Sequence, residues 1–244
     1  MSIHFISDLH LSDEKPGISR LFIDYLSGPA RSADIVYLLG DIFEYWIGDD
    51  ASMPQYQNEC SALRSLADSG VKTFFMHGNR DFLVGEAFAQ ATGCSILEDP
   101  CTIDLYGQDT LLTHGDFLCT DDVKHQEFRA FALDPQNQKQ ILSLPIEQRE
   151  KIAQGIRLLS KSNNAHEPAD IIDVNQQAIE NCLREYKVSR IIHGHTHRPA
   201  THEFELDGQP AIRTVLSDWH EDEGFVLICD EDSASTLKLS PREF

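Results

Sequence analysis

Residues 3–10 read Ile-His-Phe-Ile-Ser-Asp-Leu-His, a short apolar run that ends in two metal-binding residue types, Asp8 and His10. The run Ile3–Ser7 predicts a first β-strand. In an extended segment, Asp-x-His places both side chains on the same side of the chain. This stretch therefore predicts a strand whose carboxyl end presents ligands for an ion.

The same pattern recurs at four later apolar runs, each followed by a carboxylate, an amide or a histidine. In chain order, the runs and the residues after them are 34–39 with Asp41, 71–76 with Asn79, 110–113 with His114, and 190–192 with His195 and His197. In an open α/β sheet, the loops at the carboxyl ends of the strands converge on one crevice. We therefore expect five separate segments to direct seven oxygen and nitrogen ligands to one place.

The residue types indicate the kind of ion. Carboxylate, imidazole and amide ligands together suit borderline divalent metals such as Mn²⁺, Fe²⁺ or Zn²⁺. The set contains no thiolate, so we do not expect a structural zinc site. A single carboxylate such as Asp41 can bridge two ions, and two ions about 3.5–4 Å apart can clamp a phosphoryl oxygen and activate a water. Glycines precede Asp41, Asn79 and His195, and they allow tight turns close to a ligand.

Elsewhere the apolar runs alternate with segments whose apolar residues recur with a period near 3.6, which predicts helices between strands. The expected helices are Ile18–Leu26, Gln55–Asp68 and Gly85–Ala91, and the runs expected to add antiparallel or mixed strands are Thr201–Leu206, Ala211–Leu216, Gly224–Cys229 and Thr236–Leu239. This alternation predicts a layered α/β fold. With 244 residues, we expect a single domain, residues 1–244, that carries a large insert.

Residues 120–168 interrupt the alternation. They are rich in Gln, Asn, Lys and Arg, and their spacing is helical, with no strand-like run. We interpret this segment as a helical insert, or cap, over one edge of the sheet. A pair of ordinary surface helices would explain the same pattern.

The composition argues against several classes of partner. The chain has 40 acidic and 20 basic residues, a net charge of −20. It therefore lacks the basic surface of a nucleic-acid-binding protein, and an anionic membrane face repels it on average. No secretory signal and no apolar run of about 18 residues is visible, so we expect a cytoplasmic protein. The six cysteines form no CxxC pair, which favours free thiols.

Together the ligand-type residues resemble the calcineurin-like metallophosphoesterase superfamily, whose pattern is D-x-H, G-D, G-N-H-[DE], H and G-H-x-H. The resemblance covers most of the chain and its set of motifs is highly specific. It implies an α/β fold of the four-layer α/β/β/α sandwich type, with a dinuclear site. It also implies an enzyme that hydrolyses phosphoesters or pyrophosphates.

One residue departs from that pattern, because Arg80 replaces the usual histidine in Gly78-Asn79-Arg80-Asp81. Arginine stays protonated and cannot act as a general acid, but it can hold phosphate oxygens bidentately. A pyrophosphate substrate needs little protonation of its leaving group, which is already a good phosphate anion. The runs 6–11, 40–46, 78–82 and 192–199 resemble a subfamily of pyrophosphohydrolases of lipid A biosynthesis. That resemblance implies water attack at the α-phosphorus of UDP-2,3-diacylglucosamine, which yields 2,3-diacylglucosamine 1-phosphate (lipid X) and UMP.

The resemblance also implies roles for individual residues. It implies two divalent ions, most simply Mn²⁺, one held by Asp8, His10, Asp41 and His197 and the other by Asp41, Asn79, His114 and His195. Asn79, Arg80 and His195 would be the catalytic residues that touch the substrate phosphate. In the insert, Asp122, Ser160 and Asn164 resemble glucosamine-binding residues. Glu167 occupies a position where the subfamily often has lysine, which leaves open whether Glu167 or Lys161 contributes to substrate binding.

A substrate with two acyl chains needs an apolar groove. Apolar residues of the insert are candidates for its lining, namely Phe128, Phe131, Ile141, Ile152, Ile156 and Leu159, although the same residues can pack the insert onto the sheet. Trp46 is a further candidate for lipid contact, with a role in the core as the alternative. A lipid substrate predicts peripheral contact of the cap with the cytoplasmic face of the inner membrane, and no protein partner is evident.

Two other functions remain open from the sequence. One is a soluble nucleotide phosphodiesterase or dinucleoside polyphosphate hydrolase of the same superfamily, which Arg80 and the long insert disfavour. The other is a non-catalytic scaffold, which is disfavoured because such scaffolds lose metal ligands and this chain keeps all seven. The remaining conspicuous histidines are expected to lie in the core or on the surface rather than to bind metal, namely His4, His77, His125 and His202.

Overall fold

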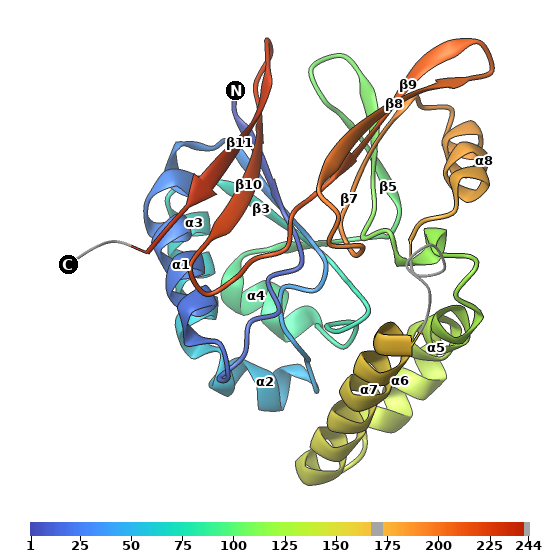
Figure 1. Cartoon of the computed structure of the whole chain (residues 1–244). Coiled ribbons are helices and arrows are strands. Elements are labelled where there is room, and N and C mark those ends of the chain that lie inside the picture. Colours follow the sequence, from blue (N-terminus) through green and yellow to red (C-terminus); the bar gives the residue numbers. More distant parts are fainter. Residues whose placement is uncertain (167–172, 242–244) are drawn as a thin grey trace.

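The computed structural model describes residues 1–166 and 173–241, and it describes the side chains of these residues except 159–166. Two sheets lie face to face (Figure 1). The first has the strand order β11-β10-β1-β2-β3-β4. Its strands are β1 (Ile3–Ile6), β2 (Ile35–Leu39), β3 (Lys72–Met76), β4 (Ser95–Leu97), β10 (Gly224–Cys229) and β11 (Ala234–Leu239).

The second sheet has the strand order β5-β6-β7-β9-β8. Its strands are β5 (Cys101–Asp104), β6 (Asp109–Leu112), β7 (Arg190–His193), β8 (Ala200–Leu206) and β9 (Gln209–Val215). Strands β1 to β4 are parallel, with Ile6 beside Leu38, and β6, β7 and β9 are parallel in the second sheet. The C-terminal strands were predicted to be antiparallel or mixed, and this is confirmed. Strands β8 and β9 pair antiparallel, as do β10 and β11, whereas β9 also pairs parallel with β7.

Helices cover the outer faces of both sheets. In chain order, the helices of the described residues are α1 (Pro16–Ser27), η1 (Pro29–Ser32), α2 (Asp49–Gln55), α3 (Gln57–Asp68), α4 (Glu86–Thr92), η2 (Asp116–Leu118), α5 (Val123–Leu133), α6 (Pro135–Leu142), α7 (Ile146–His166) and α8 (Gln176–Tyr186). Helices α1, α3 and α4 pack on the first sheet and α8 packs on the second. The result is the predicted four-layer α/β/β/α sandwich.

The strand alternation of β1 shows how the layers are built. Ile3 and Phe5 face the second sheet and join its apolar cluster. His4 and Ile6 face the helices, and His4 Nδ1 lies 3.0 Å from the hydroxyl oxygen of Tyr25 in α1. His4 therefore packs in the core, as predicted. Because successive side chains of a strand point to opposite faces, one strand joins both apolar layers.

Several elements differ from the prediction, and α2 and β5 are among those that were not expected. The expected helix Gln55–Asp68 begins at Gln57, because Gln55 ends the short helix α2, which contains Pro54, and proline removes a helical hydrogen bond. Strand β4 has only three residues, none of them buried, so it carries little apolar signal. Helix α8 was also not predicted, although it buries Ile179 and Leu183 against the second sheet.

Helices α5, α6 and α7 lie outside the four layers (Figure 1). We refer to these three helices as the cap. Asp122 and Asp134 begin α5 and α6 as N-cap residues, each accepting a backbone hydrogen bond, which is the preferred chemistry at that position. Arg149 of α7 is buried and attaches the cap to the core, because it donates to Ile47 O at 2.7 Å and to both carboxylate oxygens of Asp50.

Candidate active site

The seven predicted ligand residues meet where the carboxyl ends of the strands of both sheets converge. Two groups of three side chains have their ligand atoms within 4.8 Å of one another, and these are Asp8, His10 and His197, and Asp41, His114 and His195. Asn79 joins the second group, because its Oδ1 lies 3.2 Å from His114 Nε2. The prediction that five separate segments converge is therefore confirmed in the positions of these side chains.

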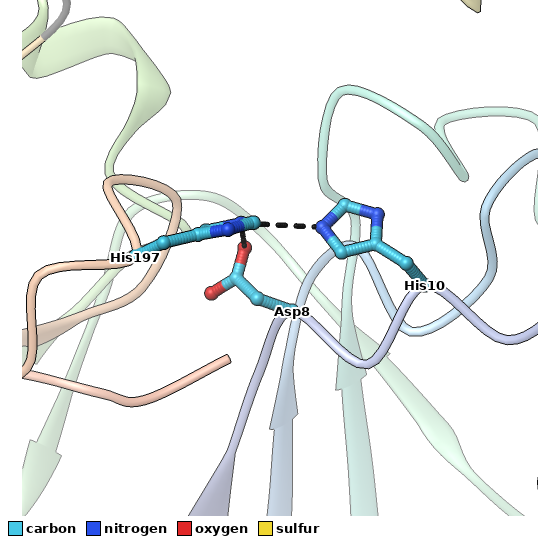
Figure 2. A group of neighbouring side chains, drawn as sticks. All are labelled: Asp8, His10 and His197. Carbon is cyan, nitrogen blue, oxygen red and sulfur yellow. Dashed lines mark hydrogen bonds and ion pairs between the residues drawn. The ribbon is translucent and has the colours of Figure 1, made fainter. Parts of the chain in front are cut away.

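The first group is drawn in Figure 2. His10 Nε2 and His197 Nε2 lie 3.2 Å apart and point toward each other, and Asp8 Oδ1 lies 3.4 Å from His197 Nε2. Asp8 Oδ1 is buried and makes no aligned hydrogen bond within the described part of the chain. Two imidazole nitrogens and an unsatisfied carboxylate oxygen facing one point fit a divalent cation.

In the second group, backbone contacts determine which ring nitrogen can act as a ligand. His114 Nδ1 lies 3.0 Å from Leu39 O and donates to it. His114 Nε2 is therefore left with its lone pair, and it points toward Asn79 Oδ1 and Asp41 Oδ1, the latter at 3.7 Å. This arrangement, in which Nδ1 donates to the backbone and Nε2 faces the other ligand atoms, is usual for a metal-binding histidine.

Asp41 lies between the two groups. Its Oδ1 faces His114 Nε2 at 3.7 Å, and its Oδ2 faces His10 Nε2 at 3.9 Å. The backbone N–H of Arg80 also donates to Asp41 Oδ1, at 2.8 Å. One carboxylate thus presents an oxygen to each group, which is the geometry that a bridging ligand requires.

The backbone at the site adopts conformations that L-residues rarely adopt. Five ligand-type residues have positive φ angles, and these are Asp8 (57°), His10 (52°), Asp41 (52°), His195 (67°) and His197 (54°). Each such non-glycine position costs about 1–3 kcal/mol and persists only where the surroundings hold it. Here hydrogen bonds between neighbouring loops hold it, from Asp8 N to Gly40 O at 3.1 Å and from His10 N to Asp41 O at 3.0 Å.

The glycines of the motifs make room for the ligand side chains. A Cβ at Gly78 would overlap Asp41 Oδ1, and a Cβ at Gly194 would overlap Asp8 Oδ2. The sequence suggested that these glycines allow tight turns, but only Gly40 has positive φ among the glycines before Asp41, Asn79 and His195. Gly78 and Gly194 are therefore required because a carboxylate packs closely against each of them, and not because their backbone forms a tight turn.

The charges of the site shift its pKa values in opposite directions. Burial lowers the pKa of His10 to about 3, and the nearby His197 contributes. Burial acts in the same sense on His114, but the carboxylates of Asp41 and Asp8 outweigh it and raise the pKa of His114 to about 9. Burial raises the pKa of Asp41 to about 7. Buried carboxylates thus require positive charge nearby, which divalent cations would supply.

An apolar cleft opens beside Asn79 and Arg80. It lies between the core and α7 of the cap, and the space of about 400 Å³ between its walls includes open solvent. Its lining residues include Trp46, Phe82, Leu83, Ile141, Ile152, Ala153 and Ile156. Both roles considered for Trp46 are compatible with the structure, because it is 1 % exposed among core aromatic residues and also borders the cleft.

Not every predicted cap residue borders this cleft. Phe128 packs against the core near Phe82, with ring centroids 6.1 Å apart, and Phe131 is 44 % exposed. Some apolar residues of the cap thus line the cleft, others pack against the core, and others lie on the surface. Three predicted residues lie outside the described side chains, namely Leu159, Ser160 and Asn164, as do Lys161 and Glu167.

The structure gives Asp122 a local role that the sequence did not reveal. Its Oδ1 accepts the backbone N–H of His125 at 2.9 Å, which caps the first turn of α5. His125 lies against His195, with ring centroids 5.0 Å apart, but it belongs to neither ligand group. That His125 lies in the core or on the surface rather than binding a metal stays a prediction.

Three carboxylates near the site were missed by sequence reasoning. Asp218 Oδ2 lies 3.3 Å from His197 Nδ1, and Glu44 Oε2 lies 3.6 Å from His10 Nδ1. Asp81 accepts the backbone N–H groups of Gly78 and Ile42, each at 2.8 Å, and so joins the loops after β2 and β3. Asp81 is part of the motif Gly78-Asn79-Arg80-Asp81 and Glu44 lies in the run 40–46 that carries the family resemblance, whereas nothing local to Asp218 indicated a role.

Comparisons with known proteins agree with this geometry. The family model described as calcineurin-like phosphoesterase matches residues 1–199. The chain is 51% identical over 238 residues to a UDP-2,3-diacylglucosamine hydrolase of Chromohalobacter salexigens, covering 98% of this chain and 97% of the relative. It is 46% identical over 232 residues to the protein of the same name in Klebsiella pneumoniae, covering 95% and 97%.

Among solved structures, a dimetal phosphatase from Danio rerio aligns with a TM-score of 0.52. The alignment covers 98% of this chain and 96% of that protein, at 16% identity. At this identity the similarity supports the fold alone.

Proposed function

The chain belongs to the calcineurin-like phosphoesterase family, and from this we propose that it hydrolyses the pyrophosphate bond of UDP-2,3-diacylglucosamine in lipid A biosynthesis. Water attacks the α-phosphorus, the bond from this phosphorus to the bridging oxygen breaks, and the products are UMP and 2,3-diacylglucosamine 1-phosphate. One observation supports this most directly: the two ligand groups joined by Asp41 open onto an apolar cleft bordered by Arg80.

The ligand groups suit two divalent cations. Asp8, His10, Asp41 and His197 would hold one, and Asp41, Asn79, His114 and His195 would hold the other. We propose Mn²⁺, because a mixed set of carboxylate, imidazole and amide suits a borderline metal. When bound, the two ions supply Lewis-acid activation of water and charge neutralisation at the phosphoryl group.

The protein's own residues hold and orient the substrate. Asn79, Arg80 and His195 are the groups we propose to contact the phosphate. The Arg80 backbone is fixed on both sides, since its N–H donates to Asp41 and its carbonyl accepts from Trp46 N at 3.2 Å. Its guanidinium can therefore orient a phosphate bidentately. No proton donor is required at position 80, because the leaving group is already a stable phosphate anion.

The cleft is the place we propose for acyl chains. Ile141, Ile152 and Ile156 contribute its cap side, and each buried CH₂ of a chain contributes about 0.8 kcal/mol. The glucosamine unit would then lie between the phosphate and the cap, where we retain Asp122, Ser160 and Asn164 as proposed contacts. The cap is accordingly proposed as an insert, residues 120–168, within a single domain.

The surface of the cap fits contact with a membrane. Most of the strongly exposed large apolar side chains belong to it, namely Val123, Phe131, Leu133, Leu142, Ile146 and Leu158. Residues 120–158 contain six acidic and six basic side chains, so the net charge of −20 resides elsewhere. Within residues 1–166 and 173–241, no helix is long and apolar enough to cross a membrane. We propose peripheral attachment through the cap on the cytoplasmic face of the inner membrane.

A substrate assay in ¹⁸O-labelled water tests the proposed reaction. With Mn²⁺ and UDP-2,3-diacylglucosamine, we expect the label in the phosphate of UMP. Label in the sugar phosphate would contradict attack at the α-phosphorus. Turnover of water-soluble nucleotide phosphodiesters or dinucleoside polyphosphates alone would favour the second function considered from the sequence.

Membrane attachment has a separate test. Leu158→Asp, which changes a side chain that is 68 % exposed on α7, should reduce sedimentation with phospholipid vesicles while leaving α-helix content unchanged. The matched control is Tyr186→Asp on α8, outside the cap and 37 % exposed. Equal sedimentation of all three proteins would contradict attachment through the cap.

A further inference from the structure

Three histidines of the site direct Nδ1 toward an acceptor and Nε2 toward the ligand groups. For His114 the acceptor is Leu39 O at 3.0 Å. For His197 it is Asp218 Oδ2 at 3.3 Å, and for His10 it is Glu44 Oε2 at 3.6 Å. A carboxylate or carbonyl behind a metal-binding histidine fixes its tautomer and raises its basicity.

Glu44, the acceptor that faces His10, differs from the other two acceptors because a residue of the cap contacts it. Glu44 is 9 % exposed, and its other carboxylate oxygen, Oε1, pairs with Arg157 Nε at 2.9 Å. Arg157 belongs to α7 of the cap, and its guanidinium also donates to Glu14 Oε1 at 2.9 Å. The chain of contacts thus runs from the cap through one buried carboxylate to a ligand-type histidine.

We propose that Glu44 is a positioning residue for His10 and that Arg157 couples the seating of α7 to the first metal group. This inference rests on the proposed two-metal function. His10 Nδ1 is buried and makes no aligned hydrogen bond within the described residues. Glu44 Oε2 is the acceptor that faces it, at 3.6 Å.

The coupling has a direct consequence for substrate binding. Ile152 and Ile156, which line the cleft, lie on the same helix as Arg157. An apolar chain that fills the cleft therefore acts on the helix that carries the arginine. By reciprocity, whatever seats α7 should strengthen metal binding at His10, and metal binding should favour the seated cap.

Mn²⁺ titration into the metal-free, full-length chain tests the role of Glu44, with isothermal calorimetry as the readout. For the wild type we expect two bound ions. Glu44→Ala should weaken one of them by about 10- to 100-fold. Glu44→Gln keeps an acceptor oxygen and should recover part of that loss. Unchanged Mn²⁺ affinity in Glu44→Ala would overturn the positioning role.

Arg157→Met distinguishes the proposed coupling between α7 and the metal group of His10 from simple charge repulsion between Arg157 and the ion. Removing a cation near the site should by Coulomb's law strengthen Mn²⁺ binding, whereas the proposal expects weaker binding of the same ion that Glu44→Ala affects. The matched control is Lys151→Met, which removes an exposed cation of the same helix while leaving the contacts of Arg157 with Glu44 and Glu14 in place, and it should leave Mn²⁺ affinity unchanged. Thermal unfolding and α-helix content should match the wild type.

Tighter or unchanged Mn²⁺ binding in Arg157→Met would overturn the coupling. If that variant is poorly folded, Arg157→Lys decides instead, because it keeps the charge but not the Nε contact, and it should still weaken the same ion. A wild type that binds no pair of Mn²⁺ ions would contradict the proposed function, a failure distinct from unchanged affinity in the variants.

Discussion

The loops that carry the ligands and the helices of the cap are held in place by different means. In the loops, five ligand-type residues have positive φ, and glycines allow close packing against Asp41 and Asp8. The cap attaches to the core through Arg149 and Arg157 and a border of apolar side chains. The ligand-type side chains are thus held by backbone hydrogen bonds and close packing, whereas the cap, to which we assign acyl-chain binding under the proposed function, is held by side-chain contacts.

We expect the largest loss of activity from a substitution of Asp41, which lies between the two ligand groups. Asp41→Ala removes an oxygen from each group, and we expect UMP release to fall about a thousandfold or more, because metal-based stabilisation contributes several kcal/mol to the transition state. The control is Asp68→Ala, an exposed carboxylate on α3. Near-normal activity in Asp41→Ala would refute a two-metal mechanism.

A smaller effect is expected in the cleft. Ile152→Asn combined with Ile156→Asn should lower kcat/KM for the diacylated substrate by at least about 100-fold, mainly through KM, because each buried aliphatic side chain contributes about 1.5–3 kcal/mol and each 1.4 kcal/mol is about a factor of ten. Ile146→Asn, on the same helix but 40 % exposed, is the control in detergent solution. If the control and the cleft variant behave alike, the cleft does not hold acyl chains.

Alanine substitutions of two glycines, one in a ligand loop and one in the cap, should change the free energy of unfolding in opposite directions. Gly78→Ala places a Cβ against the Asp41 backbone and carboxylate, so we expect a loss of about 1–3 kcal/mol in the free energy of unfolding. Gly155→Ala in α7 meets no atom within 4 Å and should stabilise the helix by about 0.5–1 kcal/mol. Urea denaturation of the metal-free proteins measures both changes in the free energy of unfolding. Equal changes in the two variants would contradict the expected difference between the ligand loops and the cap.

The smallest effect concerns Asp122, which has two proposed roles. Asp122→Ala should cost about 1 kcal/mol of stability, because it removes the N-cap of α5. Asp122→Ser retains a capping oxygen and should restore stability in thermal unfolding. If KM for the substrate rises in both variants, Asp122 also contacts the sugar; if it rises in neither, Asp122 is a capping residue only.

Much of the fold and of the ligand set was predictable because the signals are local. An apolar run followed by Asp, Asn or His marks both a strand and its carboxyl end, as in Ile3–Ile6 with Asp8. Among the elements that were missed, strand β4 lacks such a signal, because it is three residues long and partly exposed. Helix α8 is different, because Ile179, Cys182, Leu183 and Tyr186 recur at helical spacing, so it could have been predicted from the sequence.

The sequence by itself determined the identity of the seven ligand-type residues, the replacement by Arg80 and a layered α/β fold, because residue type and strand spacing are written along the chain. The four-layer arrangement was implied only by the family resemblance. Only the tertiary structure decided that Asp41 faces both groups, that Gly78 and Gly194 are needed for close packing, and that Glu44 and Asp218 lie behind His10 and His197. These contacts join residues distant in the chain. They form only when separate strands and a cap helix are brought together, so no local pattern can encode them.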